Sequence, residues 1–374
     1  MRYRGAMRIL YIASQSDRPE AHIIAGLAAR GHAIRVIAEP AGPWIDLWRA
    51  AGATVQPLVI RSRFDRDARA MLRRVVHDFG PDVVHAFTNR GLAAAVPVLR
   101  GLPARLVAYR GTTGHLSRWD PAARLSYLHP RVDAIVCVAD AVRAYLASKG
   151  VPPQKLATIR KGHDPAWYAE LAPPARGELG IRADAVLVGY VANMRKVKGA
   201  TVLLRAVASL PAESRIQLLL VGEVRDRAVR TWLRRPALAG RVVTTGFRAD
   251  AARLARAFDI FAMPSLDREG LPKAVVEAMA QGVAPVVSDA GGLPELVEHG
   301  VSGLVVPAGD ADALAAALSA LASDAALRAR LAAGARARIE GAFSLGATLD
   351  AVESLYRRLC GARSGSARSR DAVA

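Results

Sequence analysis

The sequence predicts an α/β protein with two doubly wound domains, each built around a parallel sheet. Its 374 residues are enough for two ordinary domains. Short apolar runs alternate with segments of helical spacing in both halves, which is typical of parallel strands joined by right-handed helical crossovers. A segment rich in Pro and Gly, residues 161–180, separates the halves and is typical of a linker.

Each half contains a series of short apolar runs that we interpret as strands. In the first half they are at residues 8–13, 33–38, 54–59, 82–85, 105–109, 134–138 and 156–159. In the second half they are at residues 187–191, 217–221, 241–244, 260–263, 284–287 and 303–306. Helical spacing predicts helices between several of these strands and after the last one, at residues 19–30, 91–99, 314–331 and 345–359.

The composition is that of a globular protein, with 52% hydrophobic and 23% charged residues. No apolar run approaches the roughly 18–20 residues of a membrane span. The run at residues 9–13 is too short for the core of a signal peptide and is interpreted as the first strand. Cys137 and Cys360 stand in no metal-binding or redox motif. We therefore expect a cytoplasmic protein with reduced thiols.

The net charge of +19 is unevenly distributed. Residues 1–163 carry 25 Lys and Arg against 11 Asp and Glu, whereas residues 164–374 carry 27 against 22. A genome that favours arginine explains part of the excess but not the asymmetry, so we expect an anionic partner for the first half. Nucleic acid, an anionic membrane surface and an acidic or phosphorylated acceptor are the candidates. Aromatic residues are only 5%, which disfavours the stacking platforms of a nucleic-acid binder.

The densest basic run is at residues 61–74. Its spacing predicts an amphipathic surface helix, and helices with a basic face can lie on anionic membranes. A solvated helix is the alternative interpretation. Peripheral association with the cytoplasmic face of the inner membrane is therefore a hypothesis that accompanies the cytoplasmic prediction.

The most informative motif is the stretch from Glu269 to Glu277, in which two carboxylates bracket a glycine, a proline and an apolar run. Apolar segments at residues 259–265 and 283–288 frame it, which predicts strand, loop, helix and strand. A loop that leads into a helix leaves backbone amides free for an anion such as phosphate. Two acids beside it could hold the hydroxyl groups of a nucleotide sugar. Two solvated surface glutamates are the alternative.

This stretch resembles the E-x7-E motif of retaining GT-B glycosyltransferases, in particular family four (glycosyl transferases group 1). The resemblance extends through residues 191–199, 220–222, 288–297 and 300–307 and covers about residues 186–345. It implies a GT-B fold, in which two Rossmann-like domains face a central cleft. Residues 1–163 would bind the acceptor and residues 164–345 the nucleotide sugar. Residues 346–360 would form a helix that crosses back to the first domain, and the composition of residues 361–374 predicts a disordered tail.

The resemblance also implies roles for residues around the donor diphosphate. Lys198 matches the family's diphosphate-binding lysine, whereas the arginine expected five positions earlier is Asn193 here. Arg195, displaced by two positions, is our candidate for the missing arginine because its long fork can reach phosphate from several backbone positions. These cations would stabilise the charge that develops on the leaving diphosphate.

Other residues would bind the donor. Glu277 would hold the ribose hydroxyls, and Glu269 would lie beside the donor sugar. The amides of Gly270 and Leu271 would contact hydroxyls or phosphate, while Pro272, which has no N–H, would only shape the turn. A second group of donor-binding candidates follows neighbouring strands and comprises Gly222, Phe247 and Arg248. A core position is the alternative for Phe247.

In the first domain, many members of the family have a histidine that touches the donor sugar. That place holds Arg110 here, and His115 follows five residues later in a Gly- and Thr-rich loop. Both are candidates for the missing histidine. Ser14 and Gln15 follow the first strand, where the acceptor and donor sugars meet in the family.

The resemblance implies transfer of a hexose from a nucleoside diphosphate sugar to a hydroxyl of an acceptor glycan or glycolipid, with retention of configuration. Lipopolysaccharide or another cell-surface glycan would suit the basic first domain. No Asp-x-Asp signature stands where a metal-dependent GT-A enzyme would need one, and no Gly-x-Gly-x-x-Gly follows the first strand, so we expect neither a metal nor another cofactor. The alternatives are a nucleotide-sugar epimerase on the same fold and a basic nucleic-acid-binding protein.

Overall fold

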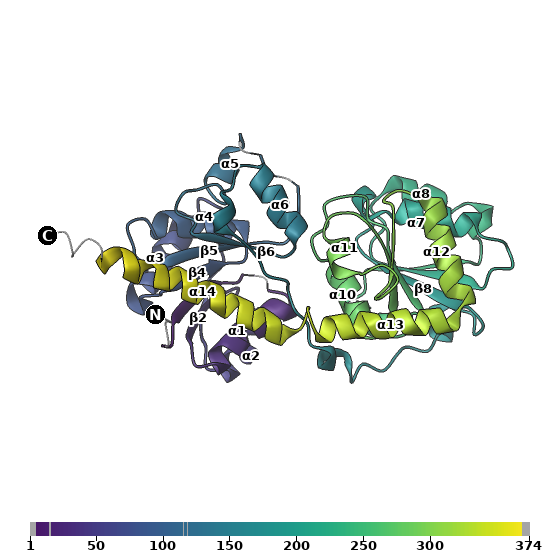
Figure 1. The fold of residues 1–374 in the computed structure, drawn as a ribbon, viewed down its shortest axis with the longest axis horizontal. Helices are drawn as coiled ribbons and strands as arrows, with labels where there is room; N and C mark the ends of the chain where they lie inside the picture. The colour runs from purple at the N-terminus through teal and green to yellow at the C-terminus, as the bar shows by residue number, and fades with distance from the viewer. Residues whose placement is uncertain (1–4, 15, 115, 118, 369–374) are drawn as a thin grey trace. The chain divides into compact units, whose positions relative to one another are not determined.

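The computed structural model describes residues 5–368 except 15, 115 and 118 (Figure 1). The chain divides into two compact units. Unit 1 contains the described residues up to Gly162 and those from Leu345 on, and unit 2 is His163–Ser344. Each unit has its own hydrophobic core around its own sheet. The predicted α/β architecture of two doubly wound domains is confirmed.

Unit 1 is built on a parallel sheet with the strand order β3-β2-β1-β4-β5-β6-β7. Its strands are β1 Arg8–Ile12, β2 Ala33–Ala38, β3 Thr54–Pro57, β4 Val83–Ala86, β5 Arg105–Arg110, β6 Ala134–Cys137 and β7 Leu156–Thr158. Its helices are α1 Arg18–Ala29, α2 Ile45–Ala50, α3 Arg66–Phe79, α4 Asn89–Val98, α5 Pro121–Arg124, α6 Asp140–Ser148 and α14 Leu345–Arg368. The order reverses between β1 and β4, which pair with Ile9 opposite Val83.

Unit 2 repeats this arrangement with the order β10-β9-β8-β11-β12-β13. Its strands are β8 Val186–Val191, β9 Ile216–Val221, β10 Val242–Gly246, β11 Ile260–Met263, β12 Ala284–Ser288 and β13 Leu304–Val306. Its helices are α7 Ala200–Ser209, α8 Arg227–Trp232, α9 Ala251–Ala255, α10 Lys273–Ala280, α11 Leu293–Leu296, α12 Ala311–Ser323 and α13 Ala325–Glu340. The order reverses between β8 and β11, and ligands of such sheets bind beyond the carboxyl ends of strands at this switch point.

The last helix, α14, belongs to unit 1 and is yellow in Figure 1. It packs against α1, and its Glu353 accepts a hydrogen bond from Arg30 at 2.8 Å and pairs with His32 at 3.1 Å. The helix continues to Arg368, well into the segment for which the sequence predicts a disordered tail. Alanine and arginine, which are frequent there, favour helix propagation. Residues 369–374 lie outside the described part of the chain.

The basic run at residues 61–74 becomes helical only from Arg66. The side chain of Asp65 caps the helix by accepting a hydrogen bond from the amide of Ala68 at 3.0 Å, and this sets the boundary. Helix α3 buries Leu72, Val75 and other apolar side chains on one face and exposes Arg66, Arg73 and Arg74. The predicted amphipathic character is therefore present, over Arg66–Phe79.

Candidate functional site

The site is formed by the loops that follow the two central strands of unit 2. The loop after β8 and the loop after β11 are joined by a hydrogen bond from the amide of Leu266 to the carbonyl of Val197, at 2.8 Å. Gly199 permits this approach, because it has φ of +70° and a Cβ at this position would lie 1.7 Å from the carbonyl oxygen of Pro264. The two loops thus meet at the switch point of the sheet.

Lys198 and Glu269 form an ion pair across this junction. The Nζ of Lys198 donates to Oε1 of Glu269 at 2.6 Å, and the hydroxyl of Ser265 donates to the same oxygen at 2.6 Å. The Glu269 side chain is 4% exposed and that of Lys198 is 22% exposed. No described residue donates to Oε2 of Glu269, and Lys198 makes no other side-chain contact of this kind among the described residues. Both groups therefore keep hydrogen-bonding capacity for a ligand.

Further contacts hold this pair in place. The hydroxyl of Tyr190 donates to the carbonyl of Lys198 at 3.0 Å, and burial together with the Glu269 carboxylate raises the pKa of this tyrosine. The hydroxyl of Ser288, at the end of β12, donates to the carbonyl of Ser265 at 2.5 Å. Residues at the ends of β8, β11 and β12 thus position one buried carboxylate.

The backbone before Glu269 has an unusual conformation. Arg268 has φ of +64°, the only positive φ of a residue other than glycine in the described chain. Such a conformation is uncommon for a residue with a Cβ, and strained backbone of this kind clusters at functional sites. Here it turns the chain so that the exposed Arg268 is followed by the buried Glu269. The amide of Gly292 holds the turn from the other side by donating to the carbonyl of Glu269 at 3.3 Å.

Two backbone amides are free in front of helix α10. In the described structure, the N–H groups of Gly270 and Leu271 have no hydrogen-bond acceptor. Pro272 follows them as the N-cap of the helix and has no N–H of its own. Amides and a helix N-terminus next to a lysine form a favourable environment for a phosphate group.

Glu277 lies on α10 and forms a separate ion pair. Its carboxylate is 3.3 Å from the Nζ of Lys273, one helical turn earlier, and its side chain is 12% exposed. The two carboxylates of the motif therefore have different basic partners. This arrangement excludes the interpretation of Glu269 and Glu277 as two freely solvated surface charges.

The residues before Lys198 are more exposed. Asn193, Arg195 and Lys196 all have exposed side chains. The described structure shows no ion pair or hydrogen bond of the Arg195 guanidinium, which is therefore available to an anion. Gly222 lies behind this loop, where its φ is +129° and a Cβ would lie 2.0 Å from the carbonyl oxygen of Ala192. Gly222 thus packs closely against this loop, and its N–H donates to the carbonyl of Gly246 at 2.7 Å.

The turn after β10 holds Phe247 and Arg248. Phe247 is 69% exposed, so the alternative of a core position is wrong. Arg248 makes two hydrogen bonds to Asp250, at 2.7 and 2.8 Å, which lower the pKa of that carboxyl. An exposed aromatic ring beside a fixed turn is a suitable surface for a nucleobase.

The candidates in unit 1 have other surroundings. Arg110 ends β5 with a buried side chain, which donates to the carbonyls of Thr112, at 3.0 Å, and Gly114 and lies over the ring of Tyr127. Its guanidinium therefore shapes the following loop. Ser14 follows β1, and its buried hydroxyl has no partner among the described residues. Gln15 and His115 lie outside the described residues.

Sequence reasoning assigned no role to Ser265, Tyr190 or Ser288. Tyr190 is the residue before the last one of β8, Ser265 follows β11 and Ser288 ends β12, and these strands border the site. That position was a usable signal, because polar side chains at the carboxyl ends of adjacent parallel strands meet at one edge of the sheet.

Two further properties of the described residues concern metal ions and membranes. The part of the chain that the structure describes contains no group of three or more His, Cys, Asp or Glu placed to hold a metal ion. In the same residues, none of the helices combines the length and the hydropathy needed to cross a bilayer.

Comparison with known proteins identifies the family. Two family profiles match the chain, "Glycosyltransferase Family 4" over residues 21–167 and "Glycosyl transferases group 1" over residues 185–324. The lipopolysaccharide core biosynthesis glycosyltransferase LpsD of Rhizobium meliloti is 31% identical over 353 residues, which cover 92% of this chain and 95% of LpsD. The chain belongs to the group 1 (family 4) glycosyltransferases. This glycosyltransferase is also 28% identical to the phosphatidyl-myo-inositol mannosyltransferase of Mycolicibacterium smegmatis, over 83% of this chain and 81% of that one.

Other relatives match over a smaller part. The chain spans about three fifths of the length of two curated relatives, 59% of WcaL from Salmonella typhimurium and 64% of EpsF from Bacillus subtilis, at 32% and 30% identity over 64% and 63% of this chain.

Solved structures support the fold of this glycosyltransferase. A glycosyltransferase from Rickettsia africae ESF-5 has a TM-score of 0.81 at 16% identity, covering 95% of this chain and 99% of that chain. Anabaena Alr3699/HepE, solved in complex with UDP, has a TM-score of 0.77 at 24% identity, covering 93% of this chain and 99% of that chain. At these identities the likeness concerns the fold alone, and the GT-B fold of two Rossmann-like domains is confirmed.

Proposed function

We propose that this glycosyltransferase moves a hexose from a nucleoside diphosphate sugar to a hydroxyl of an acceptor glycan or glycolipid, with retention of configuration. The observation that carries the proposal is the Lys198–Glu269 pair at the switch point of the unit 2 sheet. The pair has spare hydrogen-bonding capacity beside the free amides of Gly270 and Leu271. Cation, amides and carboxylate together suit a diphosphate joined to a sugar.

Each residue has a separate part in this proposal. Lys198, the two amides and the exposed Arg195 bind the diphosphate and stabilise the charge that develops on it. Oε2 of Glu269 accepts a hydrogen bond from a hydroxyl of the donor sugar. Glu277 holds the ribose hydroxyls, and Phe247 stacks on the base. Because these groups supply the positive charge, we propose that no metal ion takes part.

The proposed reaction exchanges one bond for another at the anomeric carbon. The bond from this carbon to the diphosphate oxygen breaks, and a bond to the acceptor oxygen forms on the same face of the sugar. The acceptor hydroxyl loses its proton to the departing diphosphate. The chain's own contribution is to position the donor and to stabilise the leaving group.

The names of the relatives support a cell-surface acceptor. LpsD is named for lipopolysaccharide core biosynthesis, and WcaL for colanic acid biosynthesis. The excess of basic residues in the first 163 residues suits an anionic acceptor of this class. We propose a protein that works at the cytoplasmic face of a membrane on a glycan or glycolipid of this kind. HepE, solved with UDP, makes a uridine donor the first to test.

A thermal-shift screen with UDP-, GDP-, ADP- and TDP-sugars tests this function. We expect one donor to raise the melting temperature of the wild type. Glu277→Ala should abolish the shift, because the ribose loses its carboxylate. Glu269→Ala should keep nucleotide binding and lose turnover.

Two results would contradict the proposal. One is the absence of a shift with all four donors. The other is full turnover by Glu269→Ala, which would remove the role assigned to this carboxylate.

A further inference from the structure

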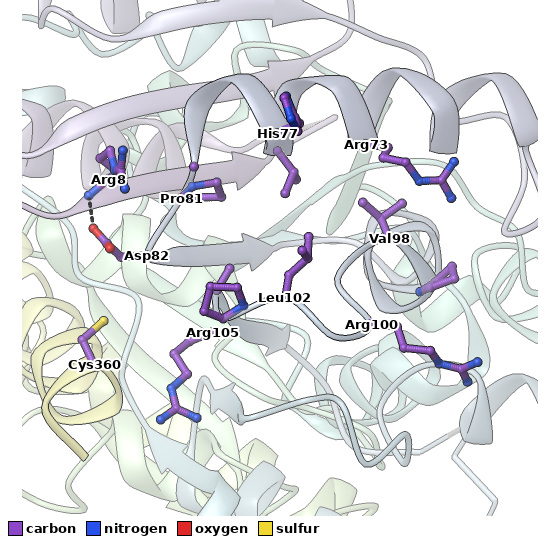
Figure 2. A pocket seen from close by; sticks show the side chains of 15 residues that line it. Arg8, Arg73, His77, Pro81, Asp82, Val98, Arg100, Leu102, Arg105 and Cys360 are labelled. Atoms are coloured by element: carbon purple, nitrogen blue, oxygen red, sulfur yellow. Dashed lines mark hydrogen bonds between the residues drawn. The ribbon is translucent and has the colours of Figure 1, made fainter. Parts of the chain in front are cut away.

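A cavity of about 670 Å³ lies in unit 1, away from the strand ends described above (Figure 2). It borders the beginnings of three adjacent parallel strands, since its lining includes Arg8 at the start of β1, Asp82 just before β4 and Arg105 at the start of β5. Helix α3, the end of α4 and Cys360 of α14 complete it. Ligands of doubly wound sheets bind at the opposite edge, beyond the carboxyl ends of the strands. The fold therefore assigns no substrate to this cavity.

The centre of the cavity is apolar. Figure 2 shows Pro81, Val98 and Leu102 on its wall between the labelled arginines, and further prolines and a valine line it. Leu102 is 41% exposed although it is a large apolar residue. Burial of such a concave surface by a hydrocarbon chain is favourable, because it removes apolar area from water on both sides.

Arginines surround this apolar centre (Figure 2). Arg105 is paired with Asp133 at 3.1 Å. By contrast, the guanidinium groups of Arg8, Arg73 and Arg100 make no ion pair or hydrogen bond with any described residue. The acidic residue of the lining, Asp82, accepts a hydrogen bond from the backbone N–H of Arg8 at 2.8 Å. The border thus carries a net positive charge, and guanidinium groups suit the oxygen atoms of a phosphate.

We propose that this cavity binds an anionic phospholipid. Arg73 and Arg100 hold its phosphate, and an acyl chain lies against Val98 and Leu102. The combination of charge and apolar surface favours this ligand, because a free phosphate would leave the apolar centre in water and a zwitterionic lipid would add a cation beside the arginines. The exposed basic face of α3 lies next to the cavity and has the charge that an anionic bilayer attracts. The cavity would attach unit 1 to such a bilayer through the strand beginnings and leave the strand ends open.

Cys360 provides a reporter for this site. It lines the cavity and is partly exposed, whereas the other cysteine, Cys137, is fully buried. The rate of alkylation of Cys360 is measured with dihexanoylphosphatidylglycerol below its micelle concentration, with dihexanoylphosphatidylcholine and with inorganic phosphate. Calorimetric titration of the same three compounds gives a second, independent measurement. We expect only the phosphatidylglycerol to protect Cys360 and to bind.

A matched pair of double variants tests the arginines. Arg73→Gln with Arg100→Gln should weaken binding of the anionic lipid by roughly 100-fold, since each charged hydrogen bond contributes about a factor of ten or more. Arg74→Gln with Arg90→Gln removes the same charge from exposed positions outside the cavity and should bind like the wild type. Leu102→Ser, at a partly exposed position, should also weaken lipid binding. Circular dichroism checks that every variant is folded.

Several results would overturn the proposal. If phosphatidylglycerol neither bound nor protected Cys360 from alkylation, the cavity would not be a lipid site. If inorganic phosphate bound as tightly as phosphatidylglycerol, the apolar surface would have no role in binding. If phosphatidylcholine bound as tightly as phosphatidylglycerol, the arginines would not select for an anionic lipid. Equal losses in the two double variants would assign the effect to surface charge and not to the cavity.

Discussion

In the described residues, each unit has a lysine that pairs with a buried glutamate at 2.6 Å, yet the two pairs differ in what surrounds them. In unit 2, the ammonium group of Lys198 pairs with no described residue other than Glu269. In unit 1, Lys161 contacts Glu20 at 2.6 Å and Asp17 at 3.0 Å, and its ammonium group lies 4.7 Å from the centre of the Tyr109 ring. Lys161 is thus surrounded by protein partners, whereas the ammonium group of Lys198 can accommodate a further acceptor from a ligand.

The surroundings of Lys161 indicate a structural role. Burial alone would lower the pKa of Lys161, but Tyr109, Glu20 and Asp17 raise it above its ordinary value. Asp17 also caps helix α1 in a capping box with Glu20, so the lysine connects the segment after β7 to the start of this helix. Loss of a fully coordinated buried charge leaves its partners unpaired and destabilises the fold, while a charge with spare hydrogen-bonding capacity can bind a ligand.

Lys161→Met should cause the largest effect on stability. The substitution leaves the carboxylates of Glu20 and Asp17 without their lysine in a site where Glu20 is 8% exposed. Removing one partner of a buried pair costs about 3–5 kcal/mol of unfolding free energy. Urea unfolding followed by circular dichroism measures this loss. A loss of unfolding free energy below about 1 kcal/mol, the range of exposed ion pairs, would show that Lys161 contributes no more to stability than a surface charge.

Lys198→Met should act mainly on catalysis. Loss of a group that stabilises developing negative charge lowers kcat by roughly 10²–10³. Release of nucleoside diphosphate from the donor, in the presence of candidate acceptor glycans, measures this change. The variant should lose less unfolding free energy than Lys161→Met, because Lys198 neutralises one carboxylate and its side chain is more exposed. Equal losses of stability for the two variants would contradict the contrast between them.

The stability of unit 1 should depend on pH through His85. This histidine is buried among Tyr11, Phe87 and Tyr356, and burial lowers its pKa from 6.5 to about 3. The unfolded chain binds a proton as the pH falls below 6.5, whereas the folded chain does not, so the stabilisation present above 6.5 is lost toward pH 3. The slope is about 1.4 kcal/mol per pH unit.

Urea unfolding at several pH values between about 7 and 5 tests this slope. His85→Asn should reduce it, while His77→Asn, at an exposed position of α3, should keep it. An unchanged slope in His85→Asn would show that other groups cause the acid sensitivity.

Phe247→Ala should produce the smallest effect. Stacking of an aromatic ring on a base contributes about 1–3 kcal/mol, and the affinity for the donor should fall accordingly. Because Phe247 is 69% exposed, the unfolding free energy should change by no more than about 0.5 kcal/mol. Calorimetry measures the affinity of Phe247→Ala for the nucleotide sugar. The control variant is Phe64→Ala, which changes an exposed phenylalanine of unit 1. The same affinity in both variants would show that Phe247 does not contact the donor.

The sequence was sufficient to predict the fold. Strands buried in a parallel sheet appear as continuous apolar runs, and each predicted strand forms in the described residues, with small shifts at its ends. The end of the last helix was not predictable in the same way, because glycine and serine in residues 361–366 indicated disorder while the alanines and arginines around them continued the helix to Arg368.

The site was predictable only in part. Glu269, Glu277 and Lys198 stand in a recognisable order along the chain. The pairing of Lys198 with Glu269 joins residues 71 positions apart, and it depends on how two loops approach each other at Gly199. The positive φ of Arg268 and the hydrogen bond from Ser265 depend on the same local geometry. Spacing along a sequence carries no information about such contacts.

Calorimetric titration with the donor nucleoside diphosphate, for the wild type and Lys198→Met, tests the central claim most directly. The claim is that Lys198, held in place by Glu269, is part of a preformed site for the diphosphate. We expect the wild type to bind and Lys198→Met to bind at least about tenfold more weakly, since it loses a charged hydrogen bond. Equal affinities for the two proteins, with both shown to be folded, would contradict the claim.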